Sequence, residues 1–208
     1  AQCQQIGAAL AQLHLAGTSL TLARPNERGF DWWCRMPTQV ASQIDDERMQ
    51  VLNAEIAHQT SIQPHWQQLP RGWIHGDLFH DNALFGGSEQ QPQLGAILDL
   101  YNACQDVWIF DLAIVANDSC CETSGHWKEA ELLALLVGYQ SVRPLTADEQ
   151  QYWPDALRAA ALRFWLSRLL TRQLQAQQLR PGDSNQIAVT KDPDEFYRKL
   201  RLRRQPHP

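Results

Sequence analysis

The sequence lacks a strong net charge and has no long apolar run. Its 208 residues carry a formal net charge of −5, so no positive excess favours binding to nucleic acid or to an anionic membrane. The basic cluster at residues 198–204 is typical of a solvated helix end. No apolar segment approaches the roughly 20 residues that a membrane-spanning helix requires. We therefore expect neither a nucleic-acid partner nor a membrane partner.

The sequence also lacks the cysteine patterns of secreted and metal-binding proteins. It has five cysteines, an odd number, and none of them forms a C-x-x-C pair. Cys120 and Cys121 are adjacent in an apolar stretch with a helical pattern. Because the given sequence opens directly in a helical pattern, we expect no signal peptide. These features favour free, buried thiols in a reducing cytoplasm.

Apolar residues recur at helical spacing over most of the chain, which predicts a mainly α-helical α+β domain. Residues 21–40 are rich in Pro, Arg, Gly and Trp, which favours an irregular loop. Thr146 to Glu149 has the form of a capping box that begins a short helix, and Asp192 is placed to cap a last helix. Longer helices are predicted from the N-terminus to near Gly17, from 44 to before Pro64, and over 108–121, 126–141 and 154–178.

A short β-hairpin is predicted in the middle of the chain. The turn residues Gly86-Gly87-Ser88 separate two apolar stretches, residues 83–85 and 94–98. Neighbouring strand ends meet in a hairpin, so Asn82 and Asp99 are expected to lie close together although they are 17 positions apart.

The hairpin is preceded by the sequence His75-Gly76-Asp77-Leu78-Phe79-His80-Asp81-Asn82. This H-x-D-x-x-x-x-N block with a following aspartate is typical of magnesium-assisted phosphoryl transfer, because one carboxylate accepts the proton of an attacking hydroxyl while an amide oxygen and a second carboxylate hold the metal. Three fixed residue types in eight positions occur by chance in roughly one such chain in a hundred. Asp77 could also cap a turn, Asn82 could lie in a loop and Asp99 could end a strand, all of which are common positions for these residue types. These roles do not explain why the three residues occur together at this spacing.

The chain resembles the C-terminal lobe of the aminoglycoside-phosphotransferase-like kinases, which share the protein-kinase fold. Two segments, residues 101–104 and 163–169, are similar in particular to the homoserine kinases of bacterial threonine biosynthesis. The other segments that carry the resemblance are Arg24-Pro25, Arg28-Gly29, 75–82, 97–104, 110–114, Asn117-Asp118, Asp192-Pro193 and Phe196.

The resemblance implies ATP and Mg²⁺ as cofactors and a role for each residue of the block. Asp77 is expected to accept the proton of the substrate hydroxyl, and Asn82 and Asp99 to bind Mg²⁺. His75 is expected to fix the loop by hydrogen bonding. Asp111 either supports that loop or only places a charge at a helix N-terminus.

The implied reaction is phosphorylation of a small amino acid, L-homoserine, to O-phospho-L-homoserine. An amino-acid substrate needs a cation for its carboxylate, and the fork of an arginine suits that group. Arg163, Arg168 and Arg172 lie on the long helix, and Arg168 is the preferred carboxylate partner because the other two are expected to face solvent. The other residues expected in the substrate pocket are Asp31, Trp32, His80, Tyr101 and Asn102.

Kinases of this family also carry an N-terminal, mostly β lobe with a glycine-rich phosphate loop and a phosphate-binding lysine. Residues 1–208 supply neither, since Gly86-Gly87 follows the catalytic block and the three lysines lie in or near predicted helices. The first residue is alanine, within a helical pattern. We therefore expect residues 1–208 to be the C-terminal lobe of a processed or partial chain, inactive when taken alone.

Three alternatives remain at this stage. Choline, aminoglycosides and sugars are substrates of related kinases that have the same block. A metallohydrolase would collect a transition metal with His75, Asp77, His80 and Asp99. The third alternative is a substrate-binding fragment without activity. The sequence makes no prediction of oligomeric state.

Overall fold

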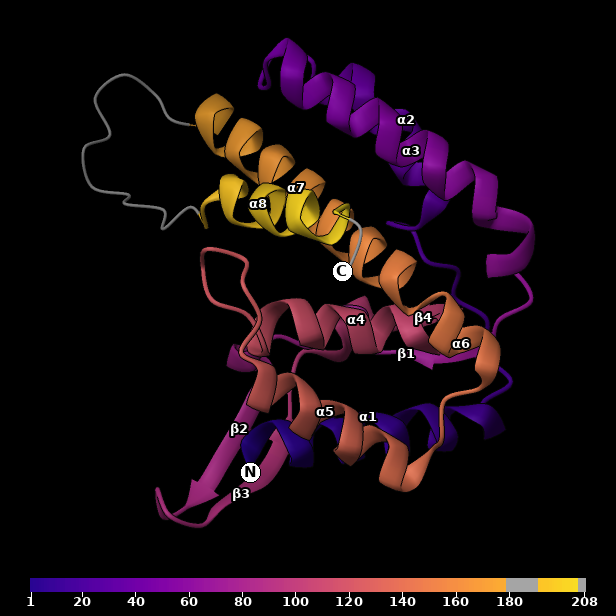
Figure 1. Ribbon diagram of the computed structural model, residues 1–208, viewed down its shortest axis with the longest axis vertical. Coiled ribbons are helices and arrows are strands. Elements are labelled where there is room, and N and C mark those ends of the chain that lie inside the picture. The colour runs from indigo at the N-terminus through magenta and orange to yellow at the C-terminus, as the bar shows by residue number, and fades with distance from the viewer. Residues whose placement is uncertain (179–190, 206–208) are drawn as a thin grey trace.

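The computed structural model describes residues 1–178 and 191–205. It is mainly helical, with short strands between the helices of its N-terminal and C-terminal halves (Figure 1). The helices are α1 (Gln2–Ala16), α2 (Phe30–Val40), α3 (Asp46–Trp66), α4 (Trp108–Ser119), α5 (Glu129–Val142), α6 (Ala147–Gln151), α7 (Trp153–Gln178) and α8 (Pro193–Arg203). The strands are β1 (Arg71–Ile74), β2 (Ala83–Gly87), β3 (Pro92–Ile97) and β4 (Cys104–Val107), and the short 3₁₀ turns are Gly17–Ser19, His80–Asn82 and Leu100–Asn102.

Helices α4 and α7 form the centre of the molecule. Helix α7 packs against α2, α3, α4 and α8, while α1 packs along α5 on the opposite side of α4 (Figure 1). Every residue of α4 from Ile109 to Asn117 is buried. A mostly apolar helix that is buried on all sides belongs in a core, which is where this one lies. In α7 the consecutive small residues 159–161 are fully buried, so neighbouring helices approach closely there.

The four strands form two antiparallel pairs. Strand β1 pairs with β4, and β2 pairs with β3 in a hairpin that projects from the helical body (Figure 1). In the hairpin Ala83 is opposite Ile97, with an irregularity between Leu84 and Phe85. The backbone N–H of Leu98 donates to the carbonyl of Asn82 at 2.9 Å. Asn82, which makes this contact, and Asp99, which follows Leu98, are the residues predicted to bind metal.

Most predicted elements agree with the structure. The hairpin, the long helix α7 and the caps of the last helices are confirmed: Thr146 and Glu149 form a capping box, and the Asp192 side chain accepts from the backbone N–H of Asp194. Among the described helices, none combines the length and the apolar character that crossing a membrane demands.

Two helix predictions were wrong. Residues 30–40, expected in a loop, form α2, because Trp33, Met36 and Val40 bury one helical face despite the unfavourable composition around them. The next helix was expected to end before Pro64 but continues through it to Trp66. Trp66 packs in the hydrophobic core, and this burial offsets the hydrogen bond that proline cannot donate.

Candidate active site

The loop between β1 and β2 is held by one buried carboxylate. Asp111, in the first turn of α4, accepts hydrogen bonds from the backbone N–H of His75 at 2.7 Å and of Gly76 at 2.9 Å. His14 of α1 lies 3.0 Å from the same carboxylate through its Nε2. Burial alone would raise the pKa of Asp111, but the hydrogen bonds from His14 and from the backbone N–H of Gly76 hold that pKa below its usual range. Asp111 therefore anchors the loop as a charged acceptor.

Gly76 has a backbone conformation that only glycine adopts without strain. Its φ is +76°, and a Cβ at this position would lie 3.0 Å from the carbonyl oxygen of Asn102. The loop thus passes close to the 3₁₀ turn at 100–102. This close approach brings Asp77 and Asn102 together.

The imidazole of His75 connects the loop to the hairpin. Its Nε2 lies 2.8 Å from the carbonyl oxygen of Leu98, and its Nδ1 accepts from the backbone N–H of Asp77 at 3.2 Å. Both ring nitrogens are therefore engaged, with Nε2 donating and Nδ1 accepting. The ring is fully buried, so His75 has the contacts of a residue that fixes the loop.

The structure brings Asp77, Asn82 and Asp99 to one cleft of about 270 Å³. The side-chain amide of Asn82 donates through Nδ2 to the carbonyl of Asp77 at 2.8 Å, which leaves its amide oxygen for another partner. Asp99 has a left-handed backbone, with φ 62° and ψ 51°, where the chain leaves the hairpin. An amide oxygen and a carboxylate are hard donors, so these residues suit Mg²⁺.

The Asp77 carboxylate is half-buried and held on one oxygen. Asn102 donates through Nδ2 to Oδ2 at 2.9 Å, and within the described ranges no hydrogen bond reaches Oδ1. Burial raises the pKa of Asp77, while the positive charges of Arg163 and Arg28 oppose that rise. A fixed carboxylate with one available oxygen and an elevated pKa is suited to accept a proton.

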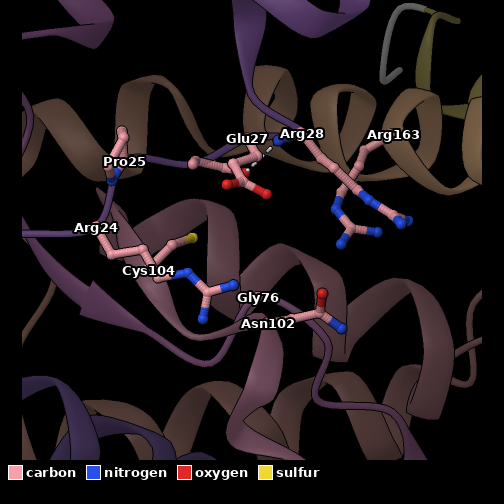
Figure 2. Close-up of a pocket in the computed structure, with 9 residues that line it drawn as sticks. Arg24, Pro25, Glu27, Arg28, Gly76, Asn102, Cys104 and Arg163 are labelled. Atoms are coloured by element: carbon pink, nitrogen blue, oxygen red, sulfur yellow. Dashed lines mark hydrogen bonds between the residues drawn. The ribbon is translucent and has the colours of Figure 1, made fainter.

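Arginine side chains gather beside Asp77. Arg24, Arg28 and Arg163 line a small pocket with Asn102 and Gly76 at its base (Figure 2). Arg28 and Arg163 also line the cleft that contains Asp77. The sequence analysis did not place Arg28 in the site, although Arg28-Gly29 was among the segments that carried the resemblance.

The residues predicted for the substrate pocket separate into two groups. Tyr101 lines the cleft, and Asn102 contacts Asp77 directly. His80 binds Asp118 through its backbone N–H at 2.6 Å and lies at a neighbouring cavity. The residues that line the cleft do not include Asp31, which is exposed on α2, or Trp32, which packs partly against the core.

The predicted carboxylate partner, Arg168, is already neutralised. Its Nη1 donates to Glu195 at 2.7 Å and to the carbonyl of Asp192 at 2.8 Å, and its guanidinium lies over the ring of Phe196. These contacts tie α7 to α8. Arg168 also lines the cleft that contains Asp77, so its role toward the substrate stays a prediction.

The contacts of the two histidines do not favour the metallohydrolase alternative. Both ring nitrogens of His75 bind groups of the loop and hairpin, and Nδ1 of His80 lies 2.9 Å from Asp118. Across residues 1–178 and 191–205, no three His, Cys, Asp or Glu side chains are grouped as a metal site would require. The donors that do meet are oxygens.

The fold and the cleft define a lobe of the protein-kinase-like type. A model described as "Phosphotransferase enzyme family" matches residues 1–145. The chain therefore belongs to this family.

The curated relatives that the chain resembles include several homoserine kinases. The chain is 39% identical over 206 residues to a homoserine kinase of Cupriavidus pinatubonensis, with 97% of this chain and 60% of that protein covered. It is 37% identical over 201 residues to a homoserine kinase of Pseudomonas aeruginosa, with the same 97% and 60% covered. The chain thus spans about 60% of the length of these relatives.

Solved structures agree on the fold. An ethanolamine kinase of Plasmodium vivax superposes with a TM-score of 0.60 at 15% identity, covering 98% of this chain and 59% of that one. A microcompartment-associated aminopropanol kinase gives a TM-score of 0.51 at 16% identity, covering 97% and 61%.

Proposed function

We propose that this chain is the catalytic lobe of an ATP- and Mg²⁺-dependent phosphotransferase that converts L-homoserine to O-phospho-L-homoserine in threonine biosynthesis. The observation that carries the proposal is the meeting of Asp77, Asn82 and Asp99 at one cleft. The names of the curated relatives support homoserine as the substrate.

In the proposed reaction, Oδ1 of Asp77 accepts the proton of the substrate hydroxyl while Asn102 holds Oδ2. The hydroxyl oxygen forms a bond to the γ-phosphorus of ATP as the bond to the bridging oxygen breaks, and ADP leaves. Asn82 and Asp99 would hold Mg²⁺, which when bound neutralises the phosphate charge. Positioning and charge stabilisation supply most of the catalysis in such reactions.

We further propose that residues 1–208 act as the C-terminal lobe of the enzyme and that a second lobe supplies the phosphate loop. The absence of a glycine-rich phosphate loop from the sequence supports this division. We also propose a cytoplasmic location, which the free cysteines support, among them the buried Cys104, Cys120 and Cys121.

A substrate panel tests this function. With the complete protein encoded by the gene, ADP release in a coupled assay is expected to depend on L-homoserine, with kcat/KM about 100-fold or more above that for choline, an aminoglycoside or a sugar. A higher kcat/KM for any of those three compounds would assign the enzyme to another substrate.

The substitution Asp99→Asn is expected to raise the Mg²⁺ concentration for half-maximal activity by on the order of 10- to 100-fold, because an amide lacks the charge of the carboxylate. Asparagine tolerates the left-handed backbone at this position, so the variant changes the charge without straining the turn. A magnesium titration of the steady-state rate measures the effect.

Asp81→Asn is the matched control, since Asp81 lines the same cleft but pairs with Lys191 at 2.9 Å. Its magnesium requirement should equal that of the wild type. An unchanged requirement in Asp99→Asn would remove Asp99 from the metal site.

A further inference from the structure

Arg163 is a buried cation without a close partner. Its side chain projects from the centre of α7, and the residue is only 4% exposed. Within the described residues it makes no ion pair or hydrogen bond, although its guanidinium lies over the ring of Phe164 at 4.0 Å. Burying a charge is costly unless the charge is paired.

Arg163 nevertheless stays protonated at neutral pH. Burial lowers the pKa of its guanidinium to about 10, while attraction to Asp77 opposes that fall. A charged group in this position calls for an anion.

A second arginine lies beside the first. Arg28 and Arg163 reach the same small pocket from the loop before α2 and from α7, with their guanidinium groups next to each other (Figure 2). The charge of Arg28 further lowers the pKa of Arg163, as expected for like charges in proximity. Among the residues that the structure describes, the Arg28 guanidinium donates only to the hydroxyl of Ser167, at 3.3 Å. Neither guanidinium forms an ion pair with a described residue, so these two neighbouring forks suit a bidentate anion.

The position of this pair selects the anion. Arg28 and Arg163 share the cleft with Asp77, but they extend from it into the pocket beside Asn102 and Gly76, which Asn82 and Asp99 do not line. Under the proposed function, Asn82 and Asp99 mark the side of the cleft where the ATP phosphates would bind. The arginines therefore face the part of the substrate that is remote from the phosphates.

We propose that Arg28 and Arg163 bind the α-carboxylate of the amino-acid substrate and orient its hydroxyl toward Asp77. Glu27 lines the same pocket and offers an acceptor for the substrate ammonium group. The inference rests on the proposed kinase activity and deepens it, because it makes this pair the basis for preferring an amino acid over an amino alcohol.

The test compares L-homoserine with 3-aminopropan-1-ol, which has the same amine and hydroxyl but no carboxylate. In the complete protein, Arg163→Gln and Arg28→Gln are each expected to lower kcat/KM for homoserine by on the order of 100-fold, the size of losing charge-assisted hydrogen bonds. The value for aminopropanol, measured well above the pKa of Asp77, should fall much less, since that substrate has no carboxylate for the pair to bind.

Arg172→Gln is the matched control. Arg172 is an exposed arginine of the same helix that donates to the carbonyl of Gln43 at 3.2 Å, and both kinetic values should match the wild type. Arg28 is exposed, so Arg28→Gln should fold normally. Arg163 is buried, and a thermal melt verifies that Arg163→Gln is folded.

Two results would overturn the inference: an equal loss on both substrates, or a rise in KM for ATP with KM for homoserine unchanged. If the wild type failed to phosphorylate homoserine, the proposed function would fall separately. Calorimetric titration with homoserine then decides the role of the pair. Binding that disappears in Arg163→Gln supports a carboxylate site, and binding that is absent or unaltered contradicts it.

Discussion

Asp77→Asn is expected to lower kcat for homoserine phosphorylation by about 10³- to 10⁴-fold, because the amide cannot accept the proton of the attacking hydroxyl. KM should change little, since the oxygen of the introduced amide can still accept the hydrogen bond that Asn102 donates to the native carboxylate. Initial rates of ADP release over a range of homoserine concentrations measure both constants.

The same substitution should not destabilise the protein. Burial raises the pKa of Asp77, so the folded state disfavours its charge relative to the unfolded state. Above that pKa the charged aspartate costs stability, and a neutral asparagine avoids the cost. The thermal midpoint of Asp77→Asn should therefore equal or exceed that of the wild type. A variant with full kcat would exclude Asp77 as the base, and a strongly lowered midpoint would assign its loss to misfolding.

The raised pKa also fixes the acid side of the pH profile. Asp77 acts as a base only when ionised, so kcat/KM should fall on acidification through a pKa above the usual 3.8 of an aspartate. A profile that is flat down to about pH 4 would contradict this assignment.

Asp111→Asn should cause the largest loss of stability, about 3–5 kcal/mol, because it disrupts a buried, charged hydrogen-bond acceptor. The carboxylate accepts from His75, Gly76 and His14 with both oxygens, and an asparagine must turn its NH₂ group toward at least one of these donors. Urea unfolding of the two proteins measures the difference. Activity should fall as well, since the loop that carries Asp77 loses its anchor.

Asp106→Asn is the control for this prediction. Asp106 lies five positions earlier and accepts from Asn26 at 2.7 Å and from the N–H of Val107 at 2.8 Å. Burial raises its pKa, so its charge is not favoured in the folded state, and the neutral variant should change stability by less than about 1 kcal/mol. Equal losses in the two variants would show that the charge of Asp111 has no special role.

The lowered pKa of Asp111 predicts the direction of its pH dependence. Its contribution to the free energy of unfolding is present above the unfolded pKa, near 3.9, and is lost as the pH falls through the lower folded value. The stability difference between wild type and Asp111→Asn should therefore narrow in acid.

The sequence predicted the parts of the site that depend on local spacing. Asp77 and Asn82 lie within one short block, and the hairpin that joins Asn82 to Asp99 is indicated by its turn glycines. The pairing of β1 with β4 was not predicted, since it joins strands about 30 residues apart that carry no local turn signal.

The arginines show where such reasoning fails. A charged residue in a helical pattern is ordinarily placed in solvent, so nothing in the pattern of α7 indicated that Arg163 is buried while Arg168 pairs with Glu195. These outcomes depend on how α7 meets the loop before α2 and the helix α8. The same dependence on packing explains why α2 was mistaken for a loop.

The most direct test of the account is the fate of the γ-phosphate in a reaction that contains the complete protein, ATP, Mg²⁺ and L-homoserine. Phosphorus NMR of the mixture is predicted to show O-phospho-L-homoserine and ADP in equal amounts, with no detectable ester from Asp77→Asn over the same reaction time. Release of inorganic phosphate without any phosphate ester would contradict transfer to the homoserine hydroxyl.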